Sequence, residues 1–171
     1  MTTPFLSPTG FAFPHGHARP VASLAQVVLD TIVAKFEDPA SVAEPLPDRR
    51  VITIGTVSVD TPVLAIMYGG TSIGLPGNDF SMLIRPDAPR TALFNIELWR
   101  HAPTSSAGGL LPAPDPVLTG SALLTMQDSW TLLEAAEACD PRQAGVVAAV
   151  GVNEPQGDMQ GVTMSLQITI P

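Results

Sequence analysis

Two stretches of the chain repeat apolar residues at the three- and four-residue spacing of an amphipathic helix. The first covers residues 20–37, where Pro20 suits the first helical turn. The second covers residues 116–138, with Asp115 and Pro116 suited to be its N-cap and first helical residue. The sequence therefore predicts two helices with these apolar faces: Val21, Leu24, Val28, Ile32 and Phe36 in the first, and Leu123, Met126, Trp130 and Leu133 in the second.

Five other segments have the short apolar runs or the alternation of apolar and polar residues that strands require. They are residues 50–54, 62–68, 91–101, 144–154 and 159–170. The last two flank a Pro-Gln-Gly turn and predict an antiparallel hairpin. The expected faces are Phe94, Ile96 and Leu98 against Asn95, Glu97 and Trp99 in the third segment, and Val162, Met164, Leu166, Ile168 and Ile170 against Thr163, Ser165, Gln167 and Thr169 in the last.

This order of elements predicts an α+β fold, with an antiparallel sheet of about five strands and two helices packed on one of its faces. Residues 1–19 contain several prolines and glycines and predict an extended Pro-rich N-terminal arm. We therefore expect two parts, the arm at 1–19 and a single α+β domain at 20–171. The loops at 70–90 and 103–116 are long and rich in Gly and Pro, and the length of the second makes it a candidate contact segment.

Composition supports a packed domain and argues against a protein that grips nucleic acid. Of the 171 residues, 45% are hydrophobic and 14% charged, so a sizeable core can form. The formal net charge of −8 disfavours a DNA-gripping surface, although DNA could still slide past such a protein. The N-terminus lacks the features of a signal peptide, and no apolar run approaches the ~20 residues of a membrane span. We expect a soluble protein made in the cytoplasm.

A metal-dependent nuclease would need converging acidic residues with a lysine nearby. Asp60, Asp79 and Glu97 are the available carboxylates, but Lys35 is the only lysine in the chain and lies far from them in sequence. Glu154 and Asp158 flank the hairpin turn on diverging strands, which is poor geometry for sharing an ion. We therefore expect no metal site at either place.

Other catalytic arrangements are equally incomplete. His15 and His17 have no local third metal ligand, and Cys139 is the single cysteine, expected to be a structural thiol near a helix end. His101 is followed by a loop, the chain has no G-x-S-x-G, and GTSIGLPG lacks the lysine of a P-loop. The sequence predicts no catalytic, cofactor-binding or metal-binding residue, and the protein is not expected to be an enzyme.

Three arginines and one glycine have structural interpretations. Arg49, Arg50 and Arg100 lie near strand ends, where solvated or interface charges explain them better than an anion site does. Gly161, at the start of the last strand, is expected to mark a bulge or a close approach of another part of the chain.

Four segments, in this order over residues 20–171, carry a resemblance to a known family. They are PLPDRRVITIGTVSVDTPVLAIMYGG (45–70), FNIELWRHAPT (94–104), LTGSALLTMQDSWTLLEAA (118–136) and NEPQGDMQGVTMSLQITI (153–170). Together they resemble the tail terminator proteins of long-tailed actinobacteriophages, relatives of the lambda-type tail terminator. The chain departs from the expected pattern at Val59-Asp60, where relatives have Trp-Asp, and it lacks the cysteine expected soon after.

The resemblance implies a structural virion protein without catalytic residues or cofactors. Such proteins form a hexameric ring that docks on the last ring of the major tail tube protein and stops its polymerisation, while the opposite face receives the head–tail stopper or connector. Genomic DNA passes through the ring without specific binding. In such a ring we expect the loops at 70–90 and 103–116 and the arm at 1–19 to contact other subunits or the tube. The implied location is the tail or neck of the virion, after assembly in the host cytoplasm.

Two alternatives remain open at this point. One is a head–tail stopper or a tail tube protein of the same virion, although a tube protein is expected to have a closed barrel and one helix. The other is a small, nuclease-like, metal-dependent enzyme, for which loss of activity on mutating Asp79 or Glu97 would be the sign.

Overall fold

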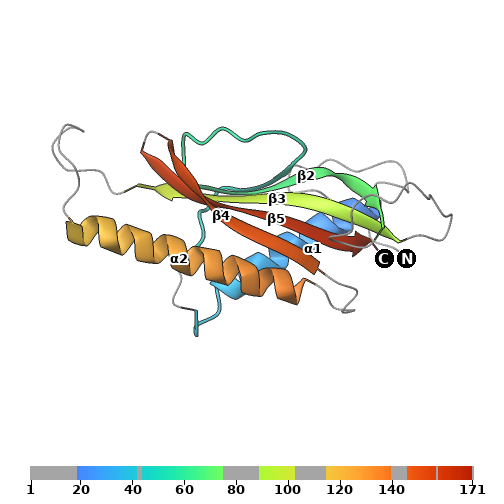
Figure 1. Cartoon of the computed structure of the whole chain (residues 1–171), viewed down its shortest axis with the longest axis horizontal. Helices are drawn as coiled ribbons and strands as arrows, with labels where there is room; N and C mark the ends of the chain where they lie inside the picture. Colours follow the sequence, from blue (N-terminus) through green and yellow to red (C-terminus); the bar gives the residue numbers. More distant parts are fainter. Residues whose placement is uncertain are drawn as a thin grey trace.

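The computed structural model describes residues 19–41, 44–74, 89–102, 115–139, 146–156 and 158–170. The predicted order of a helix, three strands, a helix and two strands is confirmed (Figure 1). The elements are α1 (Arg19–Phe36), β1 (Arg50–Thr53), β2 (Val63–Ile73), β3 (Arg90–His101), α2 (Asp115–Ala138), β4 (Val146–Gln156) and β5 (Met159–Ile170).

Several predicted features lie outside the described residues. They include the N-terminal arm up to residue 18, with His15 and His17, and most of the loops expected at 70–90 and 103–116, with Asp79. These expectations stay predictions.

The five strands form one sheet in the order β1-β2-β3-β5-β4. Neighbouring strands are antiparallel except β1 and β2, which run parallel, so the prediction of a wholly antiparallel sheet is wrong at this edge. The reason is the connection between them, residues 54–62, which crosses the sheet instead of reversing in a tight turn. Its Val57 and Val59 pack on the face of the sheet that carries no helix.

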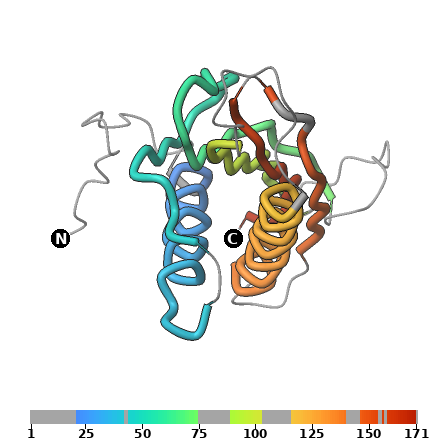
Figure 2. The backbone as a smooth tube through the Cα atoms, turned by 90° about the vertical axis from the view of Figure 1, so that its left-hand side faces the viewer, coloured from blue at the N-terminus to red at the C-terminus, as the bar shows by residue number. Residues whose placement is uncertain are grey.

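Both helices cover the other face of the sheet and lie side by side on it (Figure 2). The core between these layers joins α1 to the central strands β3 and β5. Its buried members include Val28, Leu29 and Ile32 from α1, Phe94, Ile96 and Leu98 from β3, and Val162, Met164 and Leu166 from β5. The predicted apolar faces of α1, β3 and β5 are therefore confirmed, and each large side chain in them contributes about 1.5–3 kcal/mol by burial.

A smaller cluster lies on the helix-free face and includes Trp99, which the alternation had placed among polar residues. Trp99 is on that face, as expected, but it is buried with Val63, Ala65 and Met159 beneath the crossing segment. Gly161 is its partner on β5, and a Cβ atom added there would lie 2.7 Å from two atoms of the indole ring. The expectation of a close approach at Gly161 is confirmed.

Helix α2 turns the face predicted from its leucine, methionine and tryptophan spacing away from the core. Its buried residues are Asp128, Thr131, Leu132, Ala135 and Ala136, which lie on the opposite side. This helix carries apolar residues on both sides, so periodicity alone does not identify the side that packs. Small alanines at the buried positions let the helix lie close to α1 and the sheet. Within the described residues, no helix is long and apolar enough to cross a membrane.

Candidate functional site

Two of the carboxylates considered for a metal site, Asp60 and Glu97, are engaged with nearby side chains. Asp60 Oδ1 lies 3.2 Å from Arg49 Nη1, and Glu97 Oε2 accepts a hydrogen bond of 2.9 Å from Trp99 Nε1. In the described part of the chain, no group of three or more His, Cys, Asp or Glu residues could hold a metal ion.

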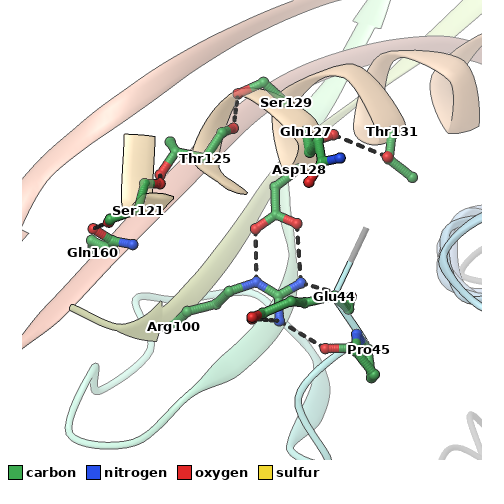
Figure 3. A network of polar contacts seen from close by, with 10 residues as sticks. All are labelled: Glu44, Pro45, Arg100, Ser121, Thr125, Gln127, Asp128, Ser129, Thr131 and Gln160. Atoms are coloured by element: carbon green, nitrogen blue, oxygen red, sulfur yellow. Dashed lines mark hydrogen bonds and ion pairs between the residues drawn. The ribbon is translucent and has the colours of Figure 1, made fainter. Parts of the chain in front are cut away.

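The most extensive polar network centres on Arg100 at the end of β3 (Figure 3). Its Nε and Nη2 donate to the two carboxylate oxygens of Asp128 on α2, at 2.7 and 3.0 Å. Its Nη1 and Nη2 also donate to the carbonyl oxygens of Pro45 and Glu44, at 2.7 and 3.0 Å. One guanidinium therefore ties a strand, a helix and the segment before β1 together.

This network is largely shielded from water, so we assign it the structural role of holding β3, α2 and the segment before β1 together. The side chains of Arg100 and Asp128 are 13% and 5% exposed. Burial raises the pKa of the Asp128 carboxyl above its ordinary value, while the hydrogen bonds and positive charge of Arg100 oppose the rise. Arg100 was predicted to be a solvated or interface charge, and the structure instead places it in a shielded bidentate pair. Arg49 and Arg50 do form more exposed ion pairs, with Asp60 and Glu37.

Several side-chain hydroxyl groups of α2 lie near this network, but none of them is positioned to act as a nucleophile. Thr125, Ser129 and Thr131 each donate to the backbone carbonyl four residues earlier, and Ser121 donates to Gln160 Oε1 (Figure 3). These bonds use the hydroxyl protons within the fold, and the residues that accept them are not bases. The arrangement stabilises local structure and does not resemble an activated serine or threonine.

A groove of about 490 Å³ lies between the start of α2 and the end of β3. Its wall includes Pro45, Pro62, Val117 and Leu124, and its arginine, Arg100, is already bonded to Asp128. The groove thus combines prolines and aliphatic side chains with the polar side chains of Glu44, His101, Ser121 and Gln160.

The outward side of α2 exposes large apolar side chains. We call Leu123, Met126 and Trp130 the outer face of α2; they are 57%, 65% and 65% exposed. Between residues 116 and 133 the only charged residue is Asp128, which is buried in its pair with Arg100. The outer face is therefore apolar at these three positions, and the carboxylate of Glu134 lies beside it, where it accepts a hydrogen bond of 2.8 Å from Trp130 Nε1.

The helix-free face of the sheet is polar but nearly uncharged over β3, β5 and β4. Thr163 donates to Asn153 Oδ1 at 2.7 Å, and Ser165 donates to Asn95 Oδ1 at 3.2 Å. Alternation places no Lys or Arg of the described strands on this face, because Arg50, Arg90 and Arg100 all occupy helix-side positions. The described strands thus place no cationic side chain on this face, and Arg49, just before β1, is paired with Asp60 of the crossing segment.

Comparison with known proteins adds no family assignment. A scan against protein-family models finds no match, and a search of the curated proteins finds none that matches.

Proposed function

We propose that this chain is a phage tail terminator, which forms a ring at the head-proximal end of the tail tube and stops its polymerisation. The observation that carries the proposal is the exposed apolar outer face of α2, Leu123, Met126 and Trp130, on an acidic protein. The order of segments that resembles tail terminators supplies the specific identity.

Exposure of the large apolar side chains on the outer face of α2 to water is unfavourable in free energy. Two of its three residues, Met126 and Trp130, are among the side-chain types enriched in protein interfaces. Contiguous exposed apolar surface on a soluble domain commonly marks a protein contact. Acidic chains repel one another, so they associate through surfaces that carry no charge. We assign this face to a contact within the assembled particle.

The proposed partners follow from the same role. They are further copies of this chain, in a ring that the resemblance makes hexameric, together with the major tail tube protein and the head–tail stopper or connector. The helix-free face, without cationic side chains in the described strands, suits a lumen through which genomic DNA moves without binding. The proposed location is the tail or neck of the virion.

Two structural features favour this proposal over its alternatives. A tube protein is expected to have one helix, whereas this chain has α2 as a second helix of 24 residues. A metal-dependent enzyme is expected to have free converging carboxylates, whereas Asp60 and Glu97 are already bonded to neighbours. A head–tail stopper remains the alternative, and a binding experiment must distinguish it from a tail terminator.

The test is the mass of the purified protein by light scattering or native mass spectrometry, alone and with tail tube protein. We expect an assembly of two or more copies of the 17.9 kDa chain. We also expect tubes to stop growing when the protein is added during polymerisation. A strict monomer that never associates with tubes contradicts the proposal. Binding to the connector without any effect on tube growth favours the stopper.

A further inference from the structure

The sheet ends in two strands whose outer edges have no partner among the described residues. At one end β4 hydrogen-bonds only to β5, and at the other end β1 hydrogen-bonds only to β2. Such an edge presents a row of backbone donors and acceptors that can pair with another strand.

The β4 edge lacks the usual features that prevent edge-to-edge pairing. Natural proteins blunt an edge with charged residues, proline or a very short strand. β4 is 11 residues long, and its first eight residues, VVAAVGVN, contain neither charge nor proline. Val147, Ala149 and Val152 are all exposed. The bulge between Asn153 and Gln156 comes only after this stretch.

We propose that β4 of one copy pairs with β1 of the next copy, so that the sheets of neighbouring subunits form one continuous sheet around the ring. The inference takes from the proposed function only that identical chains form a closed ring. In such a ring every subunit uses both of its open edges, and no edge is left for further growth.

Strand directions permit ordinary antiparallel pairing between these two edges. β1 runs parallel to β2, and β5 has the same direction as β2 because both are antiparallel to β3. β4 is antiparallel to β5 and therefore to β1. If the ring axis lies along the strands, rotation preserves these directions, and β4 meets the neighbour's β1 in antiparallel orientation.

The two open edges of one chain match each other in direction, which identifies a second copy as the occupant. Arg49 and Arg50 stand at the start of β1, partly exposed and paired within their own chain with Asp60 and Glu37. The start of β1 and the end of β4 are at the same end of the sheet. The proposed pairing uses both edges of every copy, whereas pairing two β4 edges would leave β1 open.

One row of residues across the sheet defines where to place cysteine probes. Thr53, Met67, Asn95, Ser165 and Ala149 occupy successive positions in this row. Without any stagger, Ala149 therefore faces Thr53 of the next copy. Directly opposed residues have Cα atoms about 4.5–5.5 Å apart, within the range that a disulfide spans.

The experiment mixes a Thr53→Cys chain with an Ala149→Cys chain, oxidises the assembled mixture and resolves it on a non-reducing gel. Because a closed sheet requires a stagger, Val147→Cys and Gly151→Cys are tested against Thr53→Cys in the same way. The native Cys139 is buried and gives little background. We expect a dimer in at least one mixture, none with any single variant alone, and a ladder of multimers when both cysteines are in one chain.

Two results overturn the inference while leaving the ring intact. One is self-crosslinking of Ala149→Cys alone, which would indicate β4 paired with β4. The other is an assembled mass, by light scattering, without crosslinks in any mixture. A strict monomer in all conditions overturns both the inference and the proposed function. A crosslinked ring that does not stop tube growth supports the edge pairing and contradicts only the terminator role.

Discussion

At the scale of single residues, the Arg100–Asp128 pair is the contact whose loss should affect folding most. Asp128→Ala removes both carboxylate acceptors and leaves the shielded guanidinium with the carbonyls of Glu44 and Pro45 and the half-exposed Glu44 carboxylate 3.8 Å away. Breaking a buried ion pair in this way costs about 3 kcal/mol. We expect that loss in the free energy of unfolding, measured by urea denaturation.

The control for this change is Glu44→Gln. The Glu44 carboxylate is 3.8 Å from Arg100 and half exposed, so its removal should cost less than about 1 kcal/mol. Equal losses in the two variants would show that Arg100 does not depend on Asp128 as described.

The contact between Trp99 and Gly161 gives a second prediction at this scale. Gly161→Ala would place a Cβ atom 2.7 Å from the indole and 2.8 Å from the carbonyl oxygen of Leu98, so backbone as well as side chain must move. We expect a loss of about 2 kcal/mol in the free energy of unfolding. Gly151→Ala is the matched control on the same hairpin, because nothing lies within 4 Å of its added Cβ atom. A neutral Gly161→Ala would contradict the close packing.

The thiol of Cys139 gives a prediction that depends on pH. Burial raises its pKa from 9.0 to about 11, with a hydrogen bond from Thr31 opposing the rise. The neutral thiol is favoured in the fold, so its contribution to stability is complete below pH 9.0 and is lost as pH rises through about 11. At pH 8 we expect a disulfide reagent to label Cys139 at least ~100-fold more slowly in the native protein than in urea. Equal labelling rates would place the thiol at the surface.

At the scale of elements, the orientation of α2 decides which surface the protein offers to partners. Leu132 is fully buried, whereas Leu123 belongs to the outer face, so the same substitution should have different consequences at the two positions. We expect Leu132→Ala to cost about 3 kcal/mol and Leu123→Ala less than about 1 kcal/mol in urea denaturation. The reverse order would mean that α2 packs on the side predicted from its leucine and tryptophan spacing.

The sequence predicted the buried side correctly for those elements whose two sides differ in polarity. α1 has polar residues such as Ser23 and Asp30 opposite its apolar face, and β5 alternates strictly, so the buried side of each followed from the pattern. The orientation of α2 did not follow, because both of its sides are apolar. The direction of β1 did not follow either, because four residues contain no signal for the route of the crossing segment.

The Arg100 network was harder to predict than the fold, because it joins parts of the chain that are far apart in sequence. Arg100 bonds to Asp128, 28 residues later, and to the carbonyls of Pro45 and Glu44, 55 and 56 residues earlier. The sequence predicted Arg100 near a strand end and Asp128 in a helix, but no local pattern indicated that the two form a pair. A charged residue within an otherwise uncharged helix, as Asp128 is between residues 116 and 133, is the signal that could have indicated a buried partner.

At the scale of the whole molecule, charge and apolar surface are distributed unequally, and this separation explains how an acidic protein could assemble. Copies with a net charge of −8 repel one another at a distance. The first eight residues of β4 carry no charge, and on the outer face of α2 Leu123, Met126 and Trp130 are apolar, with Glu134 beside Trp130. Close contact at these positions removes apolar surface from water and brings few like charges together.

The last prediction concerns the outer face of α2 and separates assembly from folding. In the double variant Met126→Gln/Trp130→Gln both side chains are already exposed, so the free energy of unfolding should change by less than about 1 kcal/mol. The matched control Met126→Leu/Trp130→Phe keeps the surface apolar. We expect the glutamine variant to assemble, or to bind tail tube protein, at least ~10-fold more weakly than the control, since each removed contact contributes about 1 kcal/mol or more. Light scattering over a concentration series, with and without tube protein, measures the difference. If the two variants assemble equally well and are equally stable, the outer face of α2 is not a contact surface, and the ring must form through other surfaces, such as the sheet edges.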